Sequence, residues 1–449
     1  MKMRRKTISL IAIIAVLVAL GFWTSSRWDV WFSNPEEPAY VASNEPSRIL
    51  LTFGDSTATS RNISWMCDSV VMPSYIELYD TTAHKLAQSI PAIGEVYESR
   101  SGKAAYYHGK LRDLLYGHTY KYRVATGEAV SEWHTFTMQQ EGAPASFIYV
   151  GDVQDSIDGV ANSLLKNAFK NNPDAEFLIC GGDLTERPID EYWAESFRTL
   201  DSIGQSMPVL TITGNHDYLK GIIGNLERRF SLIHSYFLDS MIGENQVFTT
   251  HYGDIQFFLL DSNREFPYLF TQREWLEKEL IASKAKWKIV IAHHPLYSIR
   301  GNMNNLVQRW MFDDLVRKYG VDLILQGHEH AYARMTNEGS TPVYTVSHCS
   351  PKSYRIEFDD IFDKFGSGTR YYQKIHASND TLYITAYDAN NSTLYDSLLI
   401  VNNGNMKNII DCGKNIREVV EFEPAPGSKK DAEFAERIKE YKEKHKDRF

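Results

Sequence analysis

Five short polar clusters in this 449-residue chain contain side chains that bind metal ions in proteins. The clusters are residues 151–154, 182–187, 214–217, 293–295 and 327–330. Two aspartates, one asparagine and at least three histidines of these clusters are candidate ligands, and no cysteine is among them. This ligand set suits borderline or hard divalent and trivalent ions such as Zn, Mn or Fe.

Each cluster follows a short apolar run that is typical of a strand buried on both faces, as in residues 147–150 and 177–180. Stretches with helical spacing, such as residues 160–171 and 271–285, alternate with these runs and predict an α/β domain. Because the carboxyl ends of strands in open α/β sheets converge on one crevice, we expect the clusters to meet. Their ligands are too many for one tetrahedral site and suit two metals that share a carboxylate. Two metals about 3.5–4 Å apart can hold the attacking and leaving oxygens of a phosphoryl group.

The α/β pattern occupies residues 145–402, and residues 46–140 before it contain short β-branched and aromatic runs separated by turns. This earlier segment predicts an antiparallel sandwich. Within it, residues 115–120 resemble the tyrosine corner of fibronectin type III domains. No group of reactive side chains gathers in this segment, so we expect it to support or position the α/β domain.

The two ends of the chain have different compositions. At the N-terminus, residues 1–26 place four cations before an apolar run at residues 8–23, which predicts a signal peptide or a signal anchor. At the C-terminus, residues 403–449 are densely charged, with Phe434, Ile438 and Tyr441 on one narrow helical stripe. We expect this tail to be a mostly solvated helix that docks weakly on the body.

Charge and cysteine content exclude several classes of protein. The chain has 48 Lys and Arg against 57 Asp and Glu, a net charge of −9, and so lacks the basic excess of a nucleic-acid-binding protein. Its four scattered cysteines are too few for a disulfide scaffold. The N-terminal segment, by contrast, predicts an exported protein, periplasmic or extracellular, with membrane contact only through that segment.

The order of the clusters resembles that of the calcineurin-like metallophosphoesterases. Within that superfamily the chain is similar to the purple acid phosphatases, which carry a fibronectin-like N-terminal domain. Residues 287–298 look like the fourth motif of the family and residues 327–334 like the fifth. The resemblance spans residues 46–401 and implies a β-sandwich followed by a four-layer α/β/β/α domain.

The resemblance also implies two metal ions per chain, Fe, Zn or Mn, that share the carboxylate of Asp183. The implied ligands of the first metal are Asp152, Asp183 and His330, and those of the second are Asp183, Asn215, His293 and His328. His216 would lie beside the substrate, where it would donate a proton to the leaving alkoxide or stabilise the transition state. His294 would lie behind the ligands rather than bind a metal.

Two positions depart from the family pattern. Glu186 stands where the purple enzymes have a tyrosine ligand, and Gln154 stands where wider members of the superfamily have a histidine ligand. We therefore expect no purple colour, and we expect Gln154 or water to complete the shell of the first metal. Glu186 and Arg187 look like the Asp-Arg pair of the wider superfamily, so we expect the Glu186 carboxylate to pair with His216 and raise its pKa.

These features predict an exported dinuclear phosphoric ester hydrolase, most simply an acid phosphatase-like phosphomonoesterase of small substrates that uses a metal-activated hydroxide. The alternatives are a phosphodiesterase of nucleotides or other small diesters, and a non-catalytic exported binding module. His348 and Lys352 replace the glycine-rich loop that the family has after its last motif. They are candidate substrate contacts, but the sequence fits equally well with their being ordinary loop residues.

Overall fold

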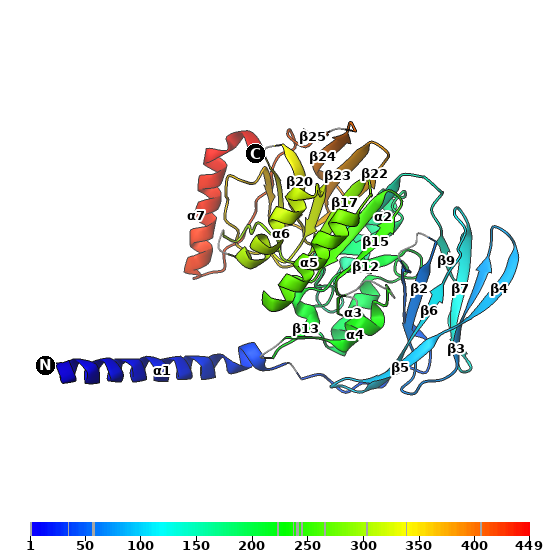
Figure 1. Ribbon diagram of the computed structural model, residues 1–449, viewed down its shortest axis with the longest axis horizontal. Coiled ribbons are helices and arrows are strands. Elements are labelled where there is room, and N and C mark those ends of the chain that lie inside the picture. The colour runs from blue at the N-terminus through cyan, green and yellow to red at the C-terminus, as the bar shows by residue number, and fades with distance from the viewer. Residues whose placement is uncertain are drawn as a thin grey trace.

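The computed structural model describes residues 2–449 except 35, 56–58, 222–223, 237, 239–241, 244–245, 265, 302–303, 338 and 405. The chain begins with helix α1 (Lys2–Phe32), which projects away from the body (Figure 1). Two domains follow, and the chain ends in helix α7 (Lys429–Lys444) and a short 3₁₀ turn, Lys446–Arg448.

The N-terminal domain is a sandwich of two antiparallel sheets (Figure 1). Its strands are β1 (Ser47–Phe53), β2 (Arg61–Met66), β3 (Ser74–Asp80), β4 (Lys85–Pro91), β5 (Ile93–Glu98), β6 (Lys103–Leu111), β7 (Thr119–Thr126), β8 (Ala129–Val130) and β9 (His134–Thr137). One sheet has the order β1-β2-β6-β5, and the other has the order β4-β3-β7-β8 with β9 paired to β7. Alternating residues such as Ile63 and Trp65 face the interior of the sandwich, where Trp65 stacks on Tyr107.

The second domain contains two seven-stranded sheets. The first has the order β12-β11-β10-β22-β23-β24-β25, with β10 (Ala145–Val150), β11 (Phe177–Cys180), β12 (Val209–Thr211), β22 (Tyr371–Ala377), β23 (Thr381–Asp388), β24 (Leu394–Asn402) and β25 (Lys407–Asp411). The second has the order β15-β16-β17-β18-β20-β19-β21, with β15 (Phe248–Tyr252), β16 (Ile255–Leu260), β17 (Trp287–Ala292), β18 (Leu323–Gln326), β19 (Tyr332–Asn337), β20 (Ser340–Val346) and β21 (Lys364–Gly366). Strands β10, β11 and β12 are parallel, and so are β16, β17 and β18.

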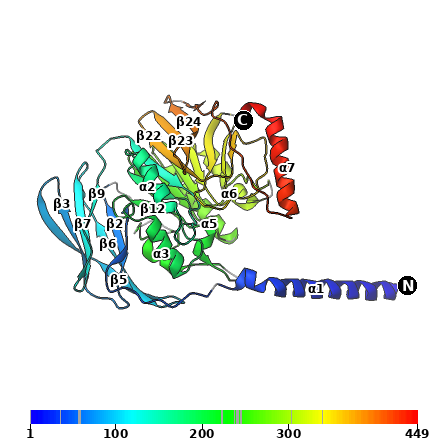
Figure 2. The same cartoon turned by 180° about the vertical axis from the view of Figure 1, so that it is seen from behind.

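Helices cover the outer face of each sheet. They are α2 (Ala161–Asn171), α3 (Asp190–Thr199), α4 (Arg228–Ile233), α5 (Phe266–Ala282) and α6 (Leu306–Lys318). A 3₁₀ turn, Asn215–Asp217, and the short hairpin of β13 (Tyr218–Leu219) and β14 (Asn225–Leu226) complete the domain. Helices α2 and α3 lie on the first sheet (Figure 2), and α5, α6 and α7 lie on the second.

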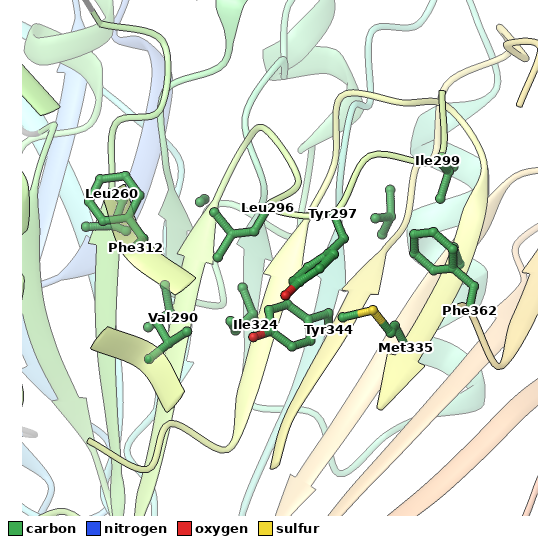
Figure 3. Close-up of a cluster of buried hydrophobic side chains, with 14 of the residues drawn as sticks. Leu260, Val290, Leu296, Tyr297, Ile299, Phe312, Ile324, Met335, Tyr344 and Phe362 are labelled. Carbon is green, nitrogen blue, oxygen red and sulfur yellow. The ribbon is translucent and has the colours of Figure 1, made fainter. Parts of the chain in front are cut away.

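Both faces of the parallel strands are buried, which explains their uninterrupted apolar sequences. In β10, Phe147 and Tyr149 face the second sheet, whereas Ile148 and Val150 pack against α2. Figure 3 shows the corresponding layer on the second sheet, where Val290 and Ile324 belong to the same cluster as Phe312 of α6. The predicted four-layer α/β/β/α domain, preceded by a β-sandwich, is confirmed.

The C-terminal tail is more integrated than the sequence indicated. The strand pattern was expected to end near residue 401, yet β25 adds residues 407–411 to the first sheet as an exposed edge strand. An edge strand needs no continuous apolar run, which is why its sequence does not stand out. Helix α7 also docks firmly rather than weakly, because Phe434 is fully buried and Ile438 and Tyr441 join the same cluster.

Candidate active site

The predicted ligands lie at the carboxyl ends of neighbouring strands. Asp152 follows β10, Asp183 follows β11, His293 follows β17, and His328 and His330 follow β18. Four of these residues have a positive φ, namely 42° at Asp152, 51° at Asp183, 69° at His328 and 44° at His330. Such angles are rare outside glycine and concentrate where function demands a particular side-chain direction.

Asp183, His293 and His328 lie at the centre of one group of ligand atoms. Their ligand atoms all lie within 4.8 Å of one another. His293 Nε2 lies 3.3 Å from Asp183 Oδ2 and 3.2 Å from Asn215 Oδ1, and His328 Nδ1 lies 2.9 Å from the same amide oxygen. Gly214 permits this approach, since a Cβ added there would lie 2.0 Å from Asp183 Oδ1.

Asp152 and His330 form a second group beside the first. His330 Nε2 lies 3.4 Å from Asp152 Oδ1, and His293 Nε2 lies 3.9 Å from that oxygen. The other oxygen of Asp152 accepts a 2.5 Å hydrogen bond from the backbone N–H of His328. Within the described part of the chain, the buried Oδ1 of Asp152 has no hydrogen-bond partner. A buried carboxylate oxygen held in place and aimed at imidazoles is the arrangement expected of a metal ligand.

Burial and charge act together on these groups. Burial raises the pKa of the Asp183 carboxyl, but His293 and His216 lower it to well below its ordinary value. Burial lowers the pKa of His293, but Asp183 and Asp152 raise it to about 10. Burial and the charge of Asp183 raise the pKa of neighbouring Asp217 to about 8. The buried carboxylates therefore favour a positive charge here, which a proton on His293 or a metal ion supplies.

His216 lies at the mouth of the site. Its backbone N–H donates a 2.8 Å hydrogen bond to Asp183 Oδ1, and its Nε2 lies 4.0 Å from Asp183 Oδ2. Its Nδ1 lies 2.5 Å from the backbone oxygen of Glu186. A proton on Nδ1 satisfies that contact and leaves Nε2 directed toward the reaction centre, a tautomer that we assign from the hydrogen bonds.

The expected pairing of the Glu186 carboxylate with His216 is wrong. That carboxylate lies 2.5 Å from the ammonium of Lys352, and only the backbone oxygen of Glu186 contacts His216. The loop after β20 brings Lys352 into the site, and a cation at that place attracts the carboxylate away from the imidazole.

The three additional candidates lie in different places. Gln154 is buried, and neither polar atom of its amide has a partner among the described residues. His294 is half-buried beside the ligands, with Nδ1 at 3.0 Å from Ser262 Oγ and its ring centroid 4.1 Å from that of His328. Arg187 lines a pocket in front of His216 rather than the ligand cluster.

Tyr354 is a further residue of the site that was not predicted; its ring stacks on His330 with a centroid distance of 4.2 Å and an interplanar angle of 15°. The Arg300 guanidinium also lies over the Tyr354 ring, 4.8 Å from its centroid. Tyr354 comes from an irregular loop without strand-end periodicity, so no local signal identifies it.

The pocket beside this cluster has a volume of about 570 Å³. Asn215, His216 and Arg187 line it together with Tyr218 and Lys220 of the β13–β14 hairpin. An anionic ester in this pocket would meet the candidate ligand Asn215 and the two cationic side chains of Arg187 and Lys220.

Comparisons with known proteins agree with this geometry. Residues 145–332 match the family described as calcineurin-like phosphoesterase, and residues 46–138 match the N-terminal domain of purple acid phosphatases. A purple acid phosphatase of Glycine max is 24% identical over 332 residues, which cover 69% of this chain and 70% of the relative. A phosphoenolpyruvate phosphatase of Allium cepa is 25% identical over 363 residues, covering 76% and 69% respectively. The Fe(3+)-Zn(2+) purple acid phosphatase 12 of Arabidopsis thaliana is 24% identical over 348 residues, covering 72% of each chain.

Solved structures show the same fold. A purple acid phosphatase from the seeds of yellow lupin (Lupinus luteus) superimposes with a TM-score of 0.67 at 18% identity, covering 80% of this chain and 75% of the other. The structure of PhoD gives a TM-score of 0.60 at 12% identity and covers 90% of this chain and 99% of the other.

Residues 145–332 therefore form a calcineurin-like phosphoesterase domain, and the chain is a phosphoester hydrolase. The domain before it, at residues 46–138, is the N-terminal domain of purple acid phosphatases. The predicted resemblance and the predicted enzymatic activity are confirmed.

Proposed function

We propose that this chain is an exported phosphomonoesterase with a two-metal centre held by Asp152, Asp183, Asn215, His293, His328 and His330. The observation that carries the proposal is the convergence of these side chains from five strand ends, with Asp152 Oδ1 held in place and unpartnered among the described residues. Two ions such as Fe, Zn or Mn, when bound, would supply the Lewis acidity that activates water and neutralises phosphoryl oxygens.

The residues around the centre have complementary roles in this proposal. Arg187 and Lys220, which line the pocket, would bind the non-reacting phosphate oxygens. His216, oriented by the backbone oxygen of Glu186, would act in its doubly protonated form, keeping the Nδ1 proton and donating the Nε2 proton to the leaving alkoxide. The Asp183 carboxylate contacts both His293 of the ligand cluster and the backbone N–H of His216. It would therefore hold His216 at a fixed position relative to the ligands.

Hydrolysis of a chromogenic phosphate monoester and of its matching diester tests the proposal. The chain would be supplied in turn with Mn, Zn and Fe and compared with Asp183→Asn and with Asp322→Asn. Asp322 is an equally buried carboxylate that lies just before β18, at the opposite end of the strand from the site. We expect monoester turnover to fall at least about 100-fold in Asp183→Asn and to persist in Asp322→Asn.

Three results would contradict the proposal. A preference for the diester would favour the phosphodiesterase alternative. Equal turnover in Asp183→Asn would place the chemistry elsewhere. Turnover of neither ester with any of the three metals would remove the general phosphatase interpretation.

We also propose that α1 is retained as an anchor after export. Residues Ile13–Phe32 form a helix long and apolar enough to cross a membrane, and none of this segment is buried in the protein. The cations Lys2, Arg4, Arg5 and Lys6 favour a cytoplasmic N-terminus and place the enzyme on the outer side.

A further inference from the structure

One wall of the substrate pocket comes from outside the two domains. Ser33 and Asn34, directly after α1, line the same pocket as His216 and Lys220. The side chain of Asn34 is paired with the backbone of Lys220, from which its oxygen accepts a 2.8 Å hydrogen bond and to which its nitrogen donates one of 3.0 Å. The segment that leaves the anchor helix is therefore part of the site.

Glu37 fixes this segment to the body. Its carboxylate is fully buried and lies 2.5 Å and 3.0 Å from the two terminal nitrogens of Arg229. It also accepts a 2.7 Å hydrogen bond from the backbone N–H of Asp190. Arg229 in turn donates to the backbone oxygen of Pro188, which lines the same pocket. The buried ion pair holds the linker, the pocket and the end of α1 in one arrangement.

Helix α1 has the features of an anchor that ends at a membrane surface. Its 31 residues extend about 46 Å, enough to cross a bilayer and continue beyond it. Its last third carries Trp23, Trp28, Trp31 and Phe32, whose rings contact one another. Such aromatic residues are typical of the membrane interface. The helix is unbroken through residues 19–26, where a signal peptidase would need an accessible extended segment.

This arrangement brings the pocket close to the bilayer. Asn34 is two residues beyond the end of α1, and two residues reach at most about 7 Å. In both views α1 projects on the side of the body that carries α6 and α7 (Figures 1 and 2). The pocket that contains His216 thus opens beside the foot of the helix.

Exposed apolar side chains lie on the same edge of the domain. Helices α5 and α6 begin after the ends of β16 and β17, at the edge that holds the ligands. Near the start of these helices Trp310 is 65% exposed and Phe270, Leu306 and Val307 are each 40% exposed. A patch of this kind beside an anchor helix suits contact with lipid.

We propose that the segment after α1, held to the body through Asn34 and Glu37, fixes the substrate pocket against the bilayer, so that the enzyme acts on phosphate monoesters carried by lipid headgroups. This inference rests on the proposed phosphomonoesterase function. Arg187 and Lys220 meet the phosphate, and the exposed patch with Trp310 and Phe270 rests on the surface from which the substrate comes.

A spacer between anchor and linker tests the inference. The full chain in phosphatidylcholine vesicles would be assayed with a soluble chromogenic monoester and with phosphatidic acid in the same vesicles. A flexible Gly-Ser insertion of about ten residues between Phe32 and Ser33 leaves the linker docked but adds about 17 Å of slack. We expect the insertion to lower phosphatidic acid hydrolysis at least about tenfold, with soluble turnover unchanged within about twofold.

The outcomes separate the two proposals. Equal hydrolysis of phosphatidic acid with and without the spacer would overturn the inference, and so would turnover of the soluble ester alone by the natural chain. Turnover of neither substrate would remove the phosphomonoesterase proposal itself.

Two pairs of substitutions refine the test. Trp310→Ser should lower the ratio of phosphatidic acid turnover to soluble ester turnover. Ile281→Ser, which changes a residue 64% exposed near the far end of α5, should not lower it.

Asn34→Ala should raise KM for both substrates, because Asn34 lines the pocket. Asn44→Ala, which changes an exposed linker residue outside the pocket, should leave KM unchanged. An unchanged ratio in Trp310→Ser together with an unchanged KM in Asn34→Ala would contradict the proposed surface and linker roles.

Discussion

Glu186 contacts one neighbour through its backbone and another through its side chain. Its backbone oxygen contacts His216, and its carboxylate binds Lys352 in a pair whose side chains are 18% and 39% exposed. Glu186→Gln should therefore leave the pH dependence of kcat/KM unchanged and raise KM only a few-fold, because a partly exposed pair contributes about 1 kcal/mol or less. Steady-state kinetics across pH measures both effects. Lys352→Ala should raise KM similarly, and a displaced pH profile in Glu186→Gln would show that the carboxylate reaches His216.

Tyr354 supports His330 through the face of its ring. Tyr354→Ala should weaken metal retention by about 10–100-fold, the range found when groups that orient ligands are removed. Tyr354→Phe keeps the stacked ring and should retain metal nearly as well as the natural chain. Competition with a chelator measures retention, and equal loss in both variants would assign the effect to the hydroxyl instead.

The ligand cluster could be predicted because each member is encoded locally, by an apolar strand that ends in a polar residue. Asp152 and Asp183 are examples, and the parallel order of their strands brings them together. Lys352 and Tyr354 could not be predicted, because the path of an irregular loop across the sheet edge decides where they lie. The direction of the Glu186 side chain depends on Lys352 and was missed for the same reason.

Helix α7 illustrates how an element can be predicted while its packing is not. The stripe of Phe434, Ile438 and Tyr441 is present as expected, but its partners Phe358 and Phe422 come from segments without periodic sequence. Because distant loops supply the other half of this core, the sequence of the helix alone indicated only weak docking.

Removal of the Phe434 ring measures this packing. Phe434→Ala should lower the free energy of unfolding by about 3–5 kcal/mol, since it leaves a cavity in a fully buried cluster. Glu440→Ala, on the exposed face of the same helix, should change it by about 0.5 kcal/mol or less. Denaturant unfolding gives both values, and equal stability of the two variants would show that α7 is not part of the folded core.

The linker before β1 should be sensitive to acid through Glu37. Burial raises the pKa of this carboxyl, but its bonds with Arg229 and the Asp190 amide lower it below the ordinary 4.5. A carboxyl whose pKa is lowered by docking stabilises the docked state fully at any pH above the pKa that it has when undocked. This stabilisation is lost as the pH falls through the lowered pKa. Docking should therefore be complete at neutral pH and should be lost in acid, as the pH falls below the ordinary range of a glutamate carboxyl.

Hydrogen exchange of the amides of residues 33–46 measures this docking. At neutral pH the linker amides of Glu37→Gln should exchange rapidly, whereas those of the natural chain should do so only in acid. Glu36→Gln, which changes an exposed neighbour, should keep the slow exchange of the natural chain. Full protection in Glu37→Gln would mean that the ion pair does not hold the linker.

At the scale of the whole molecule, the order of the apolar leader, the sandwich and the α/β domain along the chain could be predicted from composition. The contacts between these segments could not. The sandwich packs Leu50, Met66 and Tyr106 against the helix layer of the catalytic domain, and the anchor segment reaches the pocket through Asn34. Each contact joins residues more than a hundred positions apart, so no local pattern reports it. The sequence therefore predicts a two-domain hydrolase with an apolar leader, and only the structure places the leader beside the site.

The number of metal ions per chain tests the central claim most directly. Elemental analysis of the purified full chain should give two ions per chain. His328→Ala and His330→Ala should each retain one, because in the proposed centre each would remove a ligand of a different metal. His84→Ala, on the exposed surface of the sandwich, should retain two. A single ion in the natural chain, or two ions in both ligand variants, would contradict a dinuclear centre at this edge of the sheets.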